Sequence, residues 1–164
     1  MLNAQDLYNE TYYLARNPDV ANAVAAGLFP TGFAHFESFG QNEGRNPSAL
    51  FDTRYYVTLN PDVAAAVAAN QLTPFQHYIA FGQAEGRNPS VLYNNQLYLS
   101  LYPDVQEAVS TSSITGIEHF QLSGQSEGRI PSKLYNSAYY LGFAEKVIKN
   151  RGWQMNKRPL FLHQ

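Results

Sequence analysis

Three histidines recur at the same place in three similar segments of the chain. They are His35, His77 and His119. Imidazole nitrogens bind zinc at about 2.1 Å and exchange protons near neutral pH. Stacked helical units would hold equivalent atoms about 8 to 10 Å apart, too far for three rings to share one ion. We therefore interpret these histidines as structural, each hydrogen-bonded to backbone or to a tyrosine hydroxyl.

A glutamate and an arginine flank a glycine in each segment and form a second candidate for charged chemistry. The pairs are Glu43 with Arg45, Glu85 with Arg87, and Glu127 with Arg129. A general base needs a perturbed environment and a nearby nucleophile, and the motifs contain no Ser-His-Asp or Cys-His arrangement. The arginine fork is suited to binding a carboxylate. We predict no catalytic residue, metal or cofactor, and arginines that bind the aspartates of a repeated Pro-Asp motif, Asp19, Asp62 and Asp104.

All of these residues belong to an internal repeat with a period of 42 to 43 residues. The copies occupy residues 8–50, 51–92 and 93–134, after a lead at residues 1–7. Each contains Pro-Asp-Val, then Thr four residues before His-[Phe/Tyr], and ends in Gly-Gln-x-Glu-Gly-Arg-x-Pro-Ser-x-Leu. A fourth copy starts at Tyr135 and departs from the pattern. A period of this length is typical of helical arrays, so we predict three repeats, a truncated repeat or capping helix at 135–150, and a tail at 151–164.

Each copy carries the signals of three short helices. The first follows a capping Asn or Asp and ends before a proline, which then opens the second helix. The third begins at a threonine, and Thr73 and Thr115 are followed three residues later by Gln or Glu, as in a capping box. Gly40, Gly82 and Gly124 are predicted to end this helix in the left-handed conformation. No segment alternates apolar and polar residues like a strand, so the predicted fold is all-α.

The composition of the chain argues against several kinds of site and ligand. The chain has no cysteine, which excludes disulfides and thiolate metal sites. Residues 145–164 hold five basic residues and one acidic residue, while the preceding residues hold six basic and twelve acidic, a net charge of −6. Such an acidic body repels phosphates, so nucleic-acid binding is not expected. No apolar run approaches the roughly 20 residues of a membrane span, and the start lacks a secretory signal pattern, so we predict a soluble protein.

The basic tail combines a large aromatic, basic residues and an apolar end, which is the composition of an interface anchor with a charged rim. Its candidate partner-binding residues are Trp153, Lys157, Arg158, Leu160, Phe161 and Leu162. Two interpretations remain open. The tail docks on another protein, or it folds back on the acidic body and caps the last repeat.

The combination of Tyr-Tyr-Leu-x-x-Asn-Pro-Asp-Val-x-x-Ala-Val with Phe-Gly-Gln-x-Glu-Gly-Arg-Asn-Pro-Ser resembles a repeat of bacterial proteins, often cyanobacterial or proteobacterial. In that family the repeat accompanies hemolysin-type (RTX) calcium-binding or other secreted, surface-associated modules. The resemblance covers Tyr12 to Leu134 and implies an extracellular or surface-associated setting. It implies no catalytic residue, and this chain lacks the glycine-rich calcium-binding part.

The function predicted from the sequence is a non-enzymatic structural or protein-interaction module. A first alternative is a linker or accessory subunit that docks in a larger assembly through its tail. A second alternative is a carbohydrate-binding module that uses exposed tyrosines. A groove lined by exposed Tyr rings beside Asn or Asp would favour the second alternative.

Overall fold

The structure is a computed structural model that describes residues 1–111 and 114–135. Its helices confirm the all-α prediction, and the described part contains only two isolated β-bridges and no strand. None of the helices described is long and apolar enough to cross a membrane. The truncated repeat after Tyr135 and the tail lie outside the described residues. So do its candidate partner-binding residues, Trp153, Lys157, Arg158, Leu160, Phe161 and Leu162.

The same succession of elements occurs in each of the three copies. The first contains α1 (Glu10–Arg16), α2 (Pro18–Ala25), α3 (Gly32–His35) and the π-helix η1 (Phe36–Gly40). The second contains α4 (Thr53–Leu59), α5 (Pro61–Ala68), α6 (Pro74–His77) and η2 (Tyr78–Gly82). The third contains α7 (Asn95–Leu101), α8 (Pro103–Ser110), α9 (Gly116–His119) and η3 (Phe120–Gly124). The third helix thus continues into a π-helix, which local signals did not predict.

Local hydrogen bonds define the helix starts. Asn9, Asp52 and Asn94 each accept a bond from a backbone N–H in the first turn of α1, α4 and α7. Thr73 and Thr115 form complete capping boxes, as predicted. A proline opens α2, α5 and α8, where its missing N–H has no cost.

The prediction of left-handed glycines at the end of the third helix is wrong. The described glycines with positive φ are Gly27, Gly44, Gly86 and Gly128, and three of these belong to the Glu-Gly-Arg turns. Gly40, Gly82 and Gly124 serve another purpose. A Cβ on Gly82 would lie 2.3 Å from Oη of Tyr56, and the other two glycines meet equivalent tyrosines. These positions need glycine because a buried tyrosine hydroxyl approaches the backbone.

The buried aromatic residues of the three repeats belong to one continuous hydrophobic core. The extensive helix–helix contacts all occur within a repeat, among its first, second and third helices. Tyr13, Tyr56 and Tyr98 are fully buried at the centre of these units. Neighbouring repeats meet mainly through connecting segments and rings: Phe75 contacts both Phe36 and Phe51 at centroid distances of 5.1 Å. The helices of neighbouring repeats are therefore not stacked in the way that the repeat period led us to expect.

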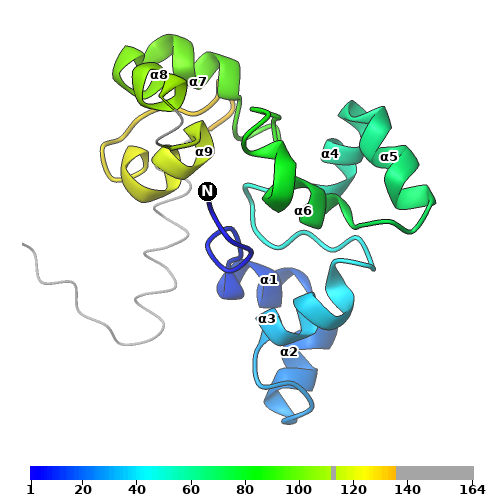
Figure 1. The fold of residues 1–164 in the computed structure, drawn as a ribbon. Helices are drawn as coiled ribbons and strands as arrows, with labels where there is room; N and C mark the ends of the chain where they lie inside the picture. The colour runs from blue at the N-terminus through cyan, green and yellow to red at the C-terminus, as the bar shows by residue number, and fades with distance from the viewer. Residues whose placement is uncertain (112–113, 136–164) are drawn as a thin grey trace, which may run out of the picture.

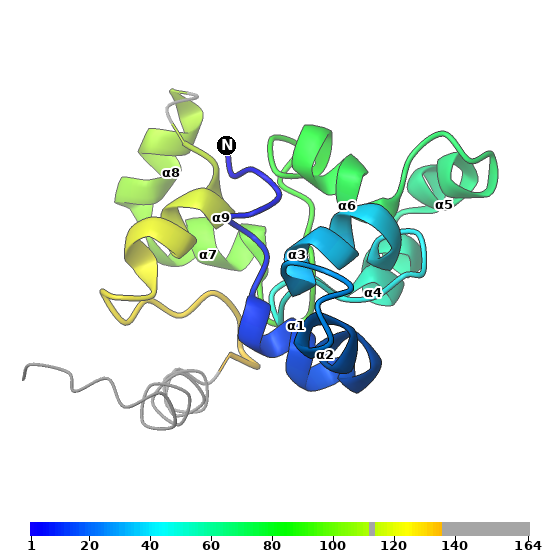
Figure 2. The same cartoon turned by 90° about the horizontal axis from the view of Figure 1, so that it is seen from below.

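The three units surround the N-terminal lead. Figure 1 shows α2, α5 and α8 at the periphery, and α6 and α9 closer to the centre, where the lead begins. Figure 2 shows the same segment between the second and third repeats. Leu2 is buried, and the side-chain amide of Gln83 both donates to its carbonyl and accepts from its N–H at 2.9 Å. Gln121 donates to the carbonyl of Asp6, so the lead connects repeats distant in sequence.

Tyr78 carries a buried hydroxyl that lacks a hydrogen-bond partner in the part of the chain described. An unpaired buried hydroxyl costs about 1 to 3 kcal/mol, and the equivalent positions in the other repeats hold Phe36 and Phe120. We therefore expect Tyr78→Phe to raise the free energy of unfolding by about 1 kcal/mol, as measured by urea denaturation. The matched change Tyr56→Phe, which removes a paired hydroxyl, should lower it instead. Destabilisation by Tyr78→Phe would show that the hydroxyl has a bound partner such as water.

Candidate functional site

In each repeat, the arginine of the Glu-Gly-Arg turn binds residues at the start of the second helix. Arg87 binds Asp62 through two parallel hydrogen bonds of 2.9 and 2.7 Å, and its Nε donates to Glu85 at 2.5 Å. The same guanidinium donates to Oδ1 of Asn60, the residue before α5. The turn after η2 is thereby fastened to the start of the second helix. Arg45 makes the equivalent contacts with Asp19, Glu43 and Asn17.

The third cluster differs in one residue. Arg129 binds Asp104 and Glu127 like its counterparts, but Tyr102 stands where the other repeats have Asn. The guanidinium lies 4.8 Å from the centroid of the Tyr102 ring, so a cation–π contact replaces the amide hydrogen bond. All three arginines are thus bound to residues of their own repeat.

Hydrogen bonds from the arginines also determine the ionisation of the aspartates. The side-chain bond from Arg45 lowers the pKa of Asp19 from 3.8 to about 2, and the bond from Arg87 does the same for Asp62. The pKa of Asp104 is lowered by Arg129. The carboxylates remain about 60% exposed, and water therefore screens much of the attraction. The clusters restrict geometry more than they add stability.

We expect acid to weaken the three clusters together. Because the pKa values of Asp19 and Asp62 are lower in the folded state, their stabilisation is complete above about pH 4 and is lost as the pH falls towards about 2. Arg87→Ala should cost about 1 kcal/mol at neutral pH and should make the acid decline of the melting temperature shallower. Melting curves of both proteins over this range test the expectation. Parallel pH profiles would contradict it.

Each repeated histidine is joined to a tyrosine of the same repeat. Nδ1 of His77 lies 3.0 Å from Oη of Tyr56, and the pairs His35–Tyr13 and His119–Tyr98 have distances of 3.0 and 2.9 Å. Burial lowers the pKa of His77, and the charge of Arg87 adds to this effect. Burial likewise raises the pKa of Tyr56 above its ordinary value. At neutral pH the pair is therefore uncharged, and it ties the first helix to the third.

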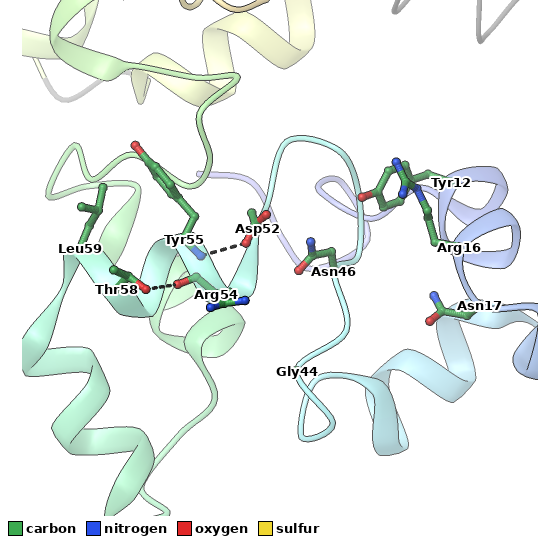
Figure 3. A pocket seen from close by; sticks show the side chains of 10 residues that line it. All are labelled: Tyr12, Arg16, Asn17, Gly44, Asn46, Asp52, Arg54, Tyr55, Thr58 and Leu59. Atoms are coloured by element: carbon green, nitrogen blue, oxygen red, sulfur yellow. Dashed lines mark hydrogen bonds between the residues drawn. The ribbon is translucent and has the colours of Figure 1, made fainter.

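Outside these internal contacts, an open groove lies between the first helices of repeats 1 and 2. It has a volume of about 650 Å³. Tyr12 and Arg16 extend from α1 on one side, and Arg54 and Tyr55 belong to α4 on the other (Figure 3). The connection carrying Asn46 and Asp52 runs between the helices. Asp52 accepts a bond from the backbone N–H of Tyr55, and its carboxylate thus caps α4 within the groove.

A second groove lies at the next seam, between α4 and α7, with a volume of about 730 Å³. Tyr55 lines this groove as well, opposite Leu97 and Gln96 of α7. The far end is formed by Ser132, Lys133 and Leu134. The two grooves therefore share Tyr55 as a lining residue.

No group of three or more His, Asp or Glu side chains suited to a metal ion occurs among residues 1–111 and 114–135. The sequence-predicted histidines, glutamates and arginines lie in separate clusters, one set in each repeat, and none of them lines the grooves. Exposed tyrosines were considered from the sequence for carbohydrate binding, but Tyr12, Tyr55 and Arg54 were not predicted to form one site. Their signal is the repeated tyrosine pair, of which one member is buried and the other is partly exposed.

Comparison with protein-family models, with curated proteins and with solved structures gives no match to this chain.

Proposed function

We propose that the chain is a non-enzymatic protein-interaction module, and that the first helix of each repeat contributes to its binding face. The recurrence of a groove at two successive seams supports this proposal. Repetition of one hollow along an array is what an extended partner segment requires. The resemblance in sequence supports a surface-associated setting for the module.

The charged and titratable residues support a structural role within this proposal. The arginine clusters and the histidine–tyrosine pairs form their hydrogen bonds inside single repeats. Such contacts hold the helices of a unit in place and leave the groove residues for other contacts. A fixed groove binds with less loss of conformational entropy than one that must first be ordered.

Carbohydrate binding is a second candidate, because the first groove has tyrosines next to Asn46 and Asp52. Aromatic faces with adjacent amide and carboxylate groups are suited to sugar rings and hydroxyls. The side chain of Asp52 is engaged as a helix cap, however, and the groove contains two arginines that a neutral sugar does not require. These features favour a protein partner.

Site-specific photo-crosslinking tests the proposed function. A photoreactive amino acid at Leu59, which is exposed at the rim of the first groove, should yield a discrete protein adduct in cells that express the chain. The matched control position is Leu28, which is exposed in the loop after α2. Equal labelling from both positions, or an adduct that contains only carbohydrate, would contradict the proposal.

A further inference from the structure

The basic side chains of the described chain fall into two sets. Arg45, Arg87 and Arg129 are ion-paired in the three clusters. Within residues 1–111 and 114–135, the remaining basic side chains form no ion pair: Arg16, Arg54 and Lys133. Arg16 and Arg54 line the first groove and Lys133 lines the second. Every unpaired basic side chain in this part of the chain is therefore at a groove.

The unpaired basic side chains at the grooves lie on a protein whose body is acidic. Residues 1–144 carry a net charge of −6, so most of the surface repels anions. Asp52 is the one carboxylate that lines the first groove, and none lines the second. The grooves are thus local basic sites on an acidic protein. Their charge complements an anionic ligand and disfavours a basic one.

Apolar walls accompany these charges. Arg16 lies 5.6 Å from the centroid of the Tyr12 ring, which presents an aromatic surface next to a cation. Leu59 is 55% exposed at the first groove, and Leu134 is 67% exposed at the second. Tyr55 connects the two grooves. A suitable ligand therefore combines carboxylates with apolar side chains along one extended chain.

We propose that the two grooves form a single track for an acidic, extended segment of a partner protein, whose carboxylates bind Arg16, Arg54 and Lys133 while its apolar side chains contact Tyr12 and Tyr55. This assignment rests on the proposed protein-interaction function and specifies the chemistry of the partner. Successive side chains of an extended segment point to opposite sides, so the repeating order Glu-Glu-Tyr-Tyr would present both a carboxylate and an aromatic ring to each wall of the track.

A fluorescent peptide of about 12 residues with the repeating order Glu-Glu-Tyr-Tyr provides a direct probe, and its extended length is about 40 Å. We expect fluorescence anisotropy to show binding that weakens between about 0.02 and 0.2 M salt. The double variant Arg16→Gln with Arg54→Gln should bind about tenfold more weakly. The control Gln106→Glu adds one negative charge on α8, away from both grooves, and should change the affinity less than about twofold.

Four results would overturn the assignment. They are equal binding by the arginine variant, equal binding of a peptide in which Lys replaces Glu, binding that does not respond to salt, and binding of an acidic oligosaccharide such as oligogalacturonate in place of the peptide. Protein crosslinking at Leu59 without peptide binding would refute the acidic track alone. Absence of both would refute the protein-interaction function as well.

Discussion

Replacement of Phe75 by alanine is expected to lower the free energy of unfolding by about 3 to 5 kcal/mol. Phe75 is only 3% exposed and packs edge-on against Phe36 of the first repeat and Phe51 of its own repeat. Because the described helices of these two units make no extensive contact with each other, the cavity should also separate their unfolding. Calorimetry should then resolve two transitions where the parent protein shows one.

The matched control is Phe33→Ala, at the equivalent position of α3. Phe33 is only partly buried, and its ring packs against Tyr8 within one repeat. We expect a loss of about 1 to 2 kcal/mol and no splitting of the transition. Equal losses for the two variants would show that Phe75 stabilises its own unit rather than the contact between units.

Gly82→Ala is expected to cost about 3 kcal/mol or more. The added Cβ would lie 2.3 Å from Oη of Tyr56 and 2.7 Å from Cδ2 of Tyr78, and neither buried ring has space to withdraw. Displacing Tyr56 would also break its hydrogen bond with His77. Urea denaturation measures the loss.

Two variants separate the clash from backbone effects. In Gly128→Ala, the added Cβ would have no heavy atom within 4 Å. The only cost expected is the strain of a φ of +70°, about 1 kcal/mol. In the second, Tyr56→Phe combined with Gly82→Ala removes the hydroxyl that the Cβ would meet, so the double variant should be less destabilised than the sum of the single changes. Simple additivity would exclude the hydroxyl as the reason for glycine.

Local rules predicted the parts of the fold that depend on neighbouring residues. The stop and start at Pro61 and the capping box at Thr73 need only the propensities of a few consecutive side chains. The π-helices were missed because they depend on how the third helix packs against the first. Gly82 was misinterpreted for the same reason, since a glycine that ends a helix and one that admits a distant tyrosine look alike in sequence.

The grooves and the position of the lead could not be predicted, because they depend on how whole repeats are placed relative to one another. One signal for the lead was present. Leu7-Tyr8 matches Leu50-Phe51 and Leu92-Tyr93, so the lead ends like a repeat. Leu7, Phe51 and Tyr93, one residue of each dipeptide, are fully or almost fully buried. The burial of Leu2 against Gln83 has no such counterpart in the repeat pattern.

The central position of the lead has a consequence for the order of events during synthesis. Leu2 and Asp6 leave the ribosome before their partners Gln83 and Gln121, which lie 81 and 115 residues further along the chain. At about 5 to 20 residues per second, the lead waits several seconds for these partners. The helix contacts within each repeat are local in sequence, whereas docking of the lead must close a long loop. Docking of the lead is therefore expected to follow synthesis of the second and third repeats.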